Sequence, residues 1–242
     1  MPGPVALIGA GAFLESMVDL DRELLGATGS RRPRVVILAT TGRQSLEAAT
    51  AAAEAVEGAR QHFAALGAEV EPVLLPAHAP DADDASLQAV GEADLVYITD
   101  LQSGTLCTMF GRTRLGAALL AAHDRGAVLV ACSGGAPALA SRQPVMRARW
   151  LPWPLRWRPA LGVLEGAAVV TGYDRWPEPL AALVALQAPR GTTILGIDAS
   201  TAIVGREGAW QVHGPARVTV WRGRHRRRYR RGDVFRLHGP TT

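Results

Sequence analysis

The chain has 242 residues, of which 48% are hydrophobic and 20% are charged, and its formal net charge is +4. These values exclude an intrinsically disordered chain, and the length favours one α/β domain over residues 1–242 rather than two domains. Every basic residue is an arginine, and many of the arginines lie after residue 140. The only cysteines, Cys107 and Cys132, do not make a disulfide framework or a Cys-x-x-Cys metal site, so we expect no metal.

The amino-terminal segment, Met1–Ile8, lacks the basic region and the long apolar run of a secretory signal. No apolar stretch of the sequence reaches the length that spans a membrane. We therefore expect a cytoplasmic protein with no membrane partner.

Apolar, β-branched segments alternate with helical segments through the first half of the chain. The expected strands are residues 5–8, 35–38, 70–75, 94–99 and 127–130. The expected helices are residues 16–25, 44–66 and 113–123, with a shorter helix after the acidic residues 81–84, which we interpret as a cap rather than a metal site. His123 stands beside Asp124 on the polar side of its helix and is expected to be solvated. This alternation predicts a doubly wound, mostly parallel sheet flanked by helices.

A glycine pair follows the first strand, at Gly9 and Gly11. A dinucleotide site needs a third glycine, but Leu14 stands there, and no acidic residue ends the next strand. We favour a plain strand-to-loop turn and expect no cofactor.

The segment 147–158 combines three tryptophans with four arginines, and Arg149 and Trp153 are representative of it. Prolines at 152, 154 and 159 exclude a continuous helix, so we predict an irregular loop over the mouth of the site. Its side chains would stack on bases or bind an anionic ligand. The alternative, which we favour, is that the tryptophans pack on the body of the protein and the arginines are solvated.

The last third of the chain is expected to contain short strands at residues 163–170, 194–198, 201–204, 210–213 and 218–221, with a helix at 179–186. The later strands predict a small C-terminal antiparallel annex at the edge of the sheet. The basic strand-turn segment, residues 218–237, would contact nucleic acid or form a charged turn that blocks pairing at a sheet edge. We favour the charged turn, because no nucleic-acid-binding fold accompanies it.

The stretch from Ala127 to Ala140 has the pattern of a nucleophile elbow. A buried strand leads through small residues to Ser133, and Pro137 begins a helix. Gly134 follows the serine and would offer its N–H group to an oxyanion. Ala131 replaces the first glycine of the usual pattern, so a tight turn without chemistry is an equal alternative. Ligands of such sheets bind at the carboxyl ends of the strands, where Ser133 would lie.

The order of these segments resembles the class I glutamine amidotransferase-like fold and, more narrowly, the cyanophycinase and dipeptidase E family of serine peptidases. The resemblance spans nearly the whole chain. The segments that carry it are Leu7–Gly11, Asp94–Thr99, Ala131–Gly135, Gly162–Gly166 and Gly196–Ala202. It implies a serine nucleophile at Ser133 and a small molecule or short peptide as the ligand of its pocket. The sequence does not decide whether the protein forms a homodimer.

Several positions depart from what the resemblance implies. Asp100 and Leu101 stand where oxyanion-hole glycines are expected, with Leu101 the remaining oxyanion candidate beside the pocket candidate Gln102. Gly172 replaces the base histidine, and Tyr173 follows it as a candidate pocket residue. Ala199 occupies a position that is often acidic, and Cys132 precedes the serine as a further pocket candidate.

A serine hydroxyl without a base is a poor nucleophile, and a carboxylate at residue 100 opposes a developing oxyanion. Two hypotheses follow: a binding or regulatory protein that has lost peptidase chemistry, or an active hydrolase of acidic (aspartyl) peptides with a rearranged base. His78 and His213 are the other histidines considered for that base, although their spacing does not favour them. An amidotransferase that uses Cys132 is disfavoured, because Ser133 occupies the apex.

Overall fold

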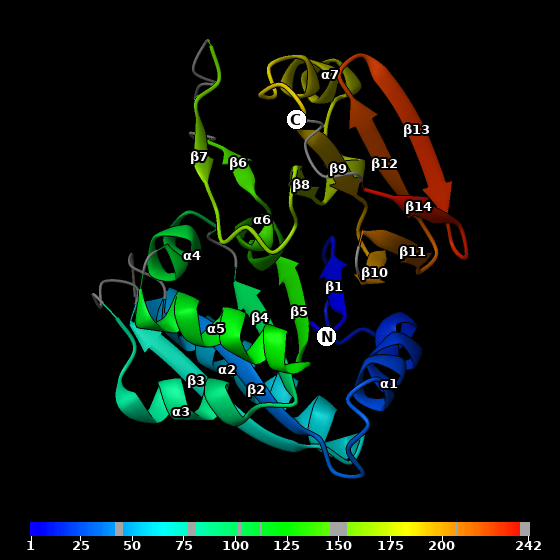
Figure 1. Ribbon diagram of the computed structural model, residues 1–242. Coiled ribbons are helices and arrows are strands. Elements are labelled where there is room, and N and C mark those ends of the chain that lie inside the picture. The colour runs from blue at the N-terminus through cyan, green and yellow to red at the C-terminus, as the bar shows by residue number, and fades with distance from the viewer. Residues whose placement is uncertain are drawn as a thin grey trace.

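An eight-stranded sheet forms the centre of the computed structural model (Figure 1), with the strand order β14-β11-β10-β1-β5-β4-β2-β3. The structure describes residues 1–41, 46–76, 81–100, 103–111, 113–145, 154–206 and 208–237. The parallel strands are β1 (Val5–Ile8), β2 (Arg34–Thr41), β3 (Glu69–Pro76), β4 (Leu95–Asp100) and β5 (Val128–Ser133). The antiparallel part adds β10 (Ala202–Arg206), β11 (Ala209–His213) and β14 (Val234–Arg236). The predicted α/β architecture is confirmed.

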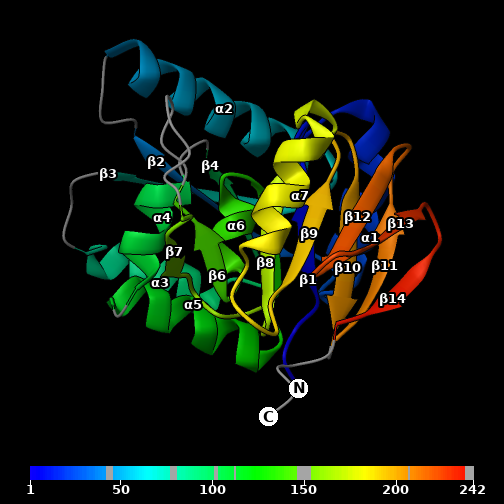
Figure 2. The same cartoon turned by 90° about the horizontal axis from the view of Figure 1, so that it is seen from above.

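Helices cover both faces of the parallel strands (Figure 2). One face carries α1 (Val18–Gly26), preceded by the 3-10 turn η1 (Glu15–Met17), and α2 (Leu46–Ala65); the other carries α3 (Asp84–Glu92), α4 (Ser103–Phe110) and α5 (Arg114–Arg125). Alternate residues of β2 enter the two cores, Val35 and Ile37 on one side and Val36 and Leu38 on the other. A strand buried on both faces must be apolar throughout, which explains its unbroken apolar run.

The residues that cap α3 and α5 lie where the sequence predicts the ends of these helices. Asp83 accepts a hydrogen bond from the backbone N–H of Ser86 at 2.8 Å, so the acidic segment before α3 is a cap, as predicted. Thr113 caps α5 in the same way, and Gly126 ends it at φ 113°. The predicted helix at residues 113–123 corresponds to α5, and the separate helix α4 precedes it and contains Cys107. None of the helices in the described ranges has the length and apolar character needed to cross a membrane.

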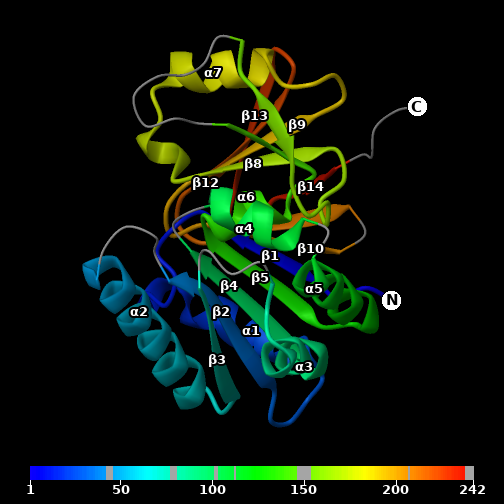
Figure 3. The ribbon, with the colours of Figure 1, turned by 90° about the vertical axis from the view of Figure 1, so that its left-hand side faces the viewer.

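A second sheet has the order β13-β12-β9-β8 and lies beyond the carboxyl ends of the parallel strands (Figure 3). It contains β8 (Ala167–Thr171), β9 (Thr193–Ile197), β12 (Arg217–Arg222) and β13 (His225–Arg230), and α7 (Glu178–Leu186) precedes β9. The short helix α6 (Gly135–Leu139) is fully buried between β5 and β8. The predicted annex is therefore divided: β10, β11 and β14 extend the main sheet, whereas β9, β12 and β13 join β8 in the second.

The tryptophan and arginine segment forms part of a β-hairpin rather than a wholly irregular loop. Its arms are β6 (Arg142–Pro144) and β7 (Trp157–Pro159), which pair antiparallel. Pairing is possible because Trp157 and Arg158 lie between Pro154 and Pro159, and the residue before a proline favours extended backbone. The base of the hairpin reaches α4, where a guanidinium nitrogen of Arg158 would lie 2.7 Å from a Cβ added at Gly104. Arg149 and Trp153 lie outside the described residues, so the predicted lid stays a prediction.

The basic C-terminal segment is a hairpin of β12 and β13, with β13 at the outer edge of the second sheet (Figure 1). Most of the β13 side chains are exposed. Arg226 and Arg228 form ion pairs with Glu178 of α7. Arginines therefore occupy the strand itself as well as the turn, which suits an edge that must not pair with other strands.

Candidate active site at Ser133

Ser133 lies at a sharp turn between β5 and α6, as the elbow pattern predicts. It is the last residue of β5, and its φ of 52° is in the left-handed region that L-residues rarely adopt. Gly135 is required by close packing, because a Cβ there would lie 2.8 Å from the carbonyl oxygen of Ile98 in β4. Ser133 and Gly134 are partly exposed at the carboxyl edge of the sheet.

The hydroxyl of Ser133 has no histidine as a hydrogen-bond partner among the described residues. Its partner there is the thiol of Cys132, with 3.5 Å between Oγ and Sγ. Cys132 is 1% exposed, and burial raises the pKa of its thiol. A buried, protonated thiol is a poor nucleophile, which further disfavours the amidotransferase alternative.

Asp100 ends β4 directly beside Ser133. The two residues pair in register across the parallel strands β4 and β5. The side chain of Asp100 is outside the described part of the structure, as are Leu101 and Gln102 entirely. Their roles at an oxyanion hole or in the pocket stay predictions.

Gly172 precedes the 3-10 turn η2 (Tyr173–Arg175) and has a φ of 57°, which suits a residue without a Cβ. Tyr173 is fixed in the second sheet, since its hydroxyl accepts a hydrogen bond from Trp221 Nε1 at 2.8 Å. Its ring covers Gly196, where an added Cβ would come within 2.4 Å of the ring. Tyr173 therefore has a clear packing role, and its role in a pocket stays a prediction.

Two aspartates near the second sheet were not singled out as site residues in the sequence. Asp174 accepts a hydrogen bond from the backbone N–H of Ala199 at 2.8 Å, which joins the Gly172 turn to the segment after β9. The Asp198 carboxylate is 4% exposed and lies 3.3 Å from Arg217 Nε. Burial raises the pKa of Asp198, although the nearby Arg217 lowers it. The sequence feature that could have identified Asp198 as a site residue is its position in Gly196–Ala202, one of the segments that carry the family resemblance.

The loop after β1 packs on this same segment. Gly9 donates a backbone hydrogen bond to the Thr201 carbonyl at 3.0 Å, and Ser200 donates one to the Ala10 carbonyl at 2.9 Å. A Cβ at Gly9 would lie 2.1 Å from the Asp198 carbonyl oxygen, so this glycine permits a close backbone approach. Ser200 and Phe13 also have positive φ, so three strained residues gather at the ends of β1, β5 and β9.

The histidines considered as an alternative base differ in position. His78 lies outside the described residues. His213 pairs in register with Ala202, which pairs with Ile8, which pairs with Cys132. With about 4.8 Å between neighbouring strands, the His213 backbone lies roughly 14 Å from that of Cys132. Its Nδ1 lies 3.6 Å from Glu23 instead, so His213 does not reach Ser133.

A buried aspartate–histidine pair, which the sequence did not reveal, lies on the face covered by α1 and α2. His62 Nε2 and Asp21 Oδ2 are 2.8 Å apart. Burial raises the pKa of Asp21 to about 6, against the lowering effect of His62. Phe13 covers the pair, with its ring centroid 5.4 Å from that of His62. The two residues come from different helices, so no local sequence pattern predicts them.

Comparison with solved structures identifies two similar folds. A peptidase from an acI-B1 Actinobacterium has a TM-score of 0.82 at 23% sequence identity, over 98% of this chain and 97% of its own. A protein from Listeria monocytogenes EGD-e, described as a candidate peptidase E, has a TM-score of 0.59 at 15% identity, over 89% of this chain and 100% of its own. No family model matches the sequence, and no curated protein does. The chain therefore shares its fold with these two proteins.

Proposed function

We propose that this protein keeps the fold and elbow of a cyanophycinase and dipeptidase E-like serine peptidase but acts as a ligand-binding or regulatory protein. The observation that carries the proposal is the surroundings of the Ser133 hydroxyl, whose described partner is the Cys132 thiol rather than an imidazole. Gly172 stands at the position where the family resemblance places the base, and it has no side chain to take a proton.

The ligand we propose is a small molecule or short peptide bound at the half-exposed Ser133. Asp100, next to Ser133 across the strand pair, adds to the argument against acyl transfer. If its carboxylate faces the site, negative charge opposes the oxyanion that must form there. A binding site does not suffer from this charge, and it would select ligands with hydrogen-bond donors or a positive charge.

The second candidate is an active serine hydrolase of aspartyl peptides with a rearranged base. The strained φ of Ser133 favours it, because strain at an accessible serine is typical of nucleophile elbows. A base would then have to come from a segment outside the described residues, such as the one that contains His78.

Fluorophosphonate labelling separates the two candidates, since the probe reacts with activated serines. We expect the unmodified protein to be labelled no faster than the Ser133→Ala variant. We also expect no hydrolysis of an aspartyl dipeptide such as Asp-Leu, followed by mass spectrometry. Labelling or hydrolysis that Ser133→Ala abolishes would establish the hydrolase instead.

A further inference from the structure

The arginines of the chain are concentrated at one edge of the second sheet. Residues 217–236 contain nine arginines and a single carboxylate, that of Asp233, so the formal charge of this segment is +8. The whole chain has a formal charge of +4, so the rest of it has a formal charge of −4. General solubility does not need such a separation of charge, whereas attraction of an anionic partner benefits from it.

Few of these arginines are neutralised within the protein. Arg217 Nε lies 3.3 Å from a carboxylate oxygen of Asp198. Arg226 and Arg228 share one carboxylate, that of Glu178 in α7. Six others are exposed and form no ion pair with the part of the chain that the structure describes: Arg222, Arg224, Arg227, Arg230, Arg231 and Arg236. The β12–β13 hairpin therefore presents uncompensated positive charge to solvent.

The backbone groups at the end of β13 show which way this strand faces. The Arg230 N–H donates to Asp233 Oδ2 at 2.8 Å, and the Arg230 carbonyl accepts from the Asp233 N–H at 2.9 Å. Arg217 stands opposite Arg230 in β12, and its carbonyl accepts from the Asp198 N–H at 3.2 Å, on the side of β9. Arg217 and Arg230 are therefore a cross-strand pair without mutual hydrogen bonds, and the backbone groups of Arg230 point away from β12.

Arg226 and Arg228 offer their backbone groups at the same open edge. The direction of these groups alternates along a strand, so both residues have the orientation of Arg230. Within the described ranges no strand pairs with this side of β13, which lies at the outer edge of the second sheet (Figure 1). Glu178 holds their guanidinium groups nearby, and that of Arg226 lies 5.5 Å from the ring centroid of Trp221. An incoming strand would meet positioned cations as well as free backbone groups.

A strand that carries carboxylates matches this edge best. Guanidinium groups bind carboxylates through paired hydrogen bonds, and side chains opposite each other on adjacent strands are in contact. A second copy of β13 would place arginines against arginines, which opposes pairing. A nucleic acid would need exposed rings on which its bases stack, but Trp221 is 7% exposed and Tyr229 is partly buried. Its phosphates also have no donor for the outward carbonyl groups of Arg226 and Arg228.

We propose that β13 binds an acidic, extended peptide segment of a partner protein, which adds one strand to the second sheet. The partner backbone pairs with the outward groups of Arg226 and Arg228, and its carboxylates contact the guanidinium groups of Arg226, Arg227 and Arg228. The same arginines oppose pairing with basic strands and with other copies of the chain, so the edge is selective. The proposal does not depend on the chemistry of Ser133, because no residue of β13 belongs to that site.

The probe is a fluorescent heptapeptide in which Glu alternates with Thr, and its matched control has Gln in place of Glu. Fluorescence anisotropy with the full chain at low salt gives both dissociation constants. We expect the Gln peptide to bind at least about tenfold more weakly, because it loses several contacts between guanidinium and carboxylate groups. Comparable affinity of the two peptides, or no binding of the acidic one at about 100 µM, would overturn the proposal. A single-stranded oligothymidylate that binds more tightly and displaces the peptide would assign the edge to nucleic acid and overturn it as well.

Arginine variants test the charge. Arg227→Gln with Arg228→Gln should weaken binding of the acidic peptide about fivefold to tenfold. The matched control is Arg31→Gln with Arg125→Gln, which removes the same charge outside the second sheet and should change the affinity less than about twofold. All four side chains are exposed, so both double variants should fold normally. Equal weakening by the two would reveal an effect of net charge alone and exclude the β13 site.

A proline variant tests the backbone pairing. Proline is tolerated on an edge strand where the N–H faces solvent, so Arg228→Pro removes a pairing donor without breaking the bonds to β12. Arg228→Gln removes the same charge but keeps that donor. We expect Arg228→Pro to bind the acidic peptide about threefold to tenfold more weakly than Arg228→Gln, while thermal unfolding checks that the sheet is intact. Equal affinity of the two variants would exclude strand pairing and with it the proposal.

Discussion

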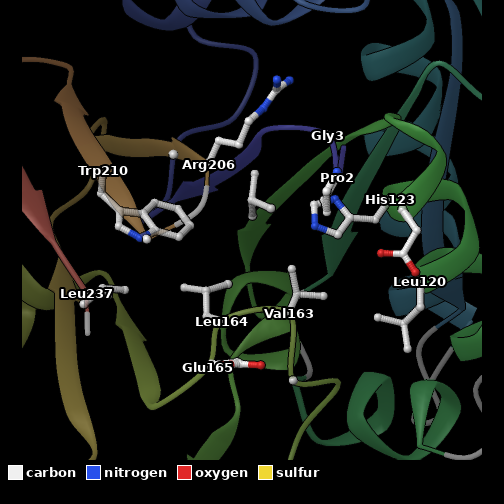
Figure 4. A pocket seen from close by; sticks show the side chains of 15 residues that line it. Pro2, Gly3, Leu120, His123, Val163, Leu164, Glu165, Arg206, Trp210 and Leu237 are labelled. Atoms are coloured by element: carbon white, nitrogen blue, oxygen red, sulfur yellow. The ribbon is translucent and has the colours of Figure 1, made fainter. Parts of the chain in front are cut away.

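The two ends of the parallel strands β1 and β5 differ in backbone strain. Phe13, Ser133 and Ser200, the three residues other than glycine that have positive φ in the described structure, lie toward the carboxyl end. At the amino end, where Trp210 and His123 line a cavity (Figure 4), no described residue other than glycine has a positive φ. Buried polar atoms without a partner among the described residues occur at both ends, Asp198 Oδ1 at the carboxyl end and Trp210 Nε1 at the amino end. The carboxyl end is therefore distinguished by strain and not by how its polar groups are satisfied.

The strained turn of a nucleophile elbow and the reactivity of the serine within it are separate properties. The turn at Ser133 depends on backbone strain and on glycine at residue 135, which the packing of α6 against β4 requires. Reactivity depends on a base from another segment. A fold can therefore keep the first property after it loses the second.

The largest expected effect is a gain in the reactivity of Ser133 when a general base is restored beside it. Gly172→His combined with Asp100→Gly and Leu101→Gly should raise fluorophosphonate labelling of Ser133 by about 100-fold or more, the usual contribution of a general base. Because φ at residue 172 is 57°, any side chain there costs about 1–2 kcal/mol of strain. The control is the same combination with Gly172→Ala, which has the strain without the imidazole. Equal labelling of both combinations would show that residue 172 does not face the serine.

The packing of the elbow can be tested through stability. Gly135→Ala should lower the free energy of unfolding by about 2–3 kcal/mol, because the new Cβ would overlap the Ile98 carbonyl. Gly58→Ala, in α2 with no atom within 4 Å of the added Cβ, should instead raise it by about 0.5–1 kcal/mol. Denaturant unfolding measures both changes. A neutral Gly135→Ala substitution would mean that the turn is looser than the structure shows.

The anchoring of the Gly172 turn should have a smaller effect. Tyr173→Phe leaves the Trp221 Nε1–H without its acceptor and should cost about 1–2 kcal/mol of stability. Tyr229→Phe is the matched control, because Tyr229 packs on Phe235 through its ring and should change stability by less than about 0.5 kcal/mol. If both variants unfold at the same denaturant concentration, the Tyr173 hydroxyl does not anchor the turn.

The smallest expected effect is a pH dependence at the amino end. The pKa of His123 is lowered chiefly by burial and also by Arg206, against the raising effect of Asp124 and the Ala127 backbone. The unfolded chain therefore binds a proton more readily, so stability is full above about pH 6.5 and falls as the pH drops below it. His123→Gln should make stability less dependent on pH between 7 and 5 in thermal unfolding. An unchanged pH dependence would indicate that His123 is open to water.

Much of the main sheet could be predicted from local patterns. The apolar runs of β2, β4 and β5 are buried on both faces, which a parallel sheet requires, and Asp83 and Thr113 cap their helices where the sequence indicates. The turn at Ser133 was predictable for the same reason, since small residues between an apolar strand and a proline leave few other conformations. Its pairing with Asp100 followed from the order of the strands.

The sequence alone determined that this chain builds a parallel sheet with a serine at a strained turn. Tertiary structure alone decided that β8 and β9 leave that sheet, that Asp21 meets His62, and that Trp210 and His123 share a cavity. The physical reason is distance along the chain. Periodicity and caps report whether a residue is buried and where an element ends, whereas the choice of partner depends on contacts between segments tens of residues apart.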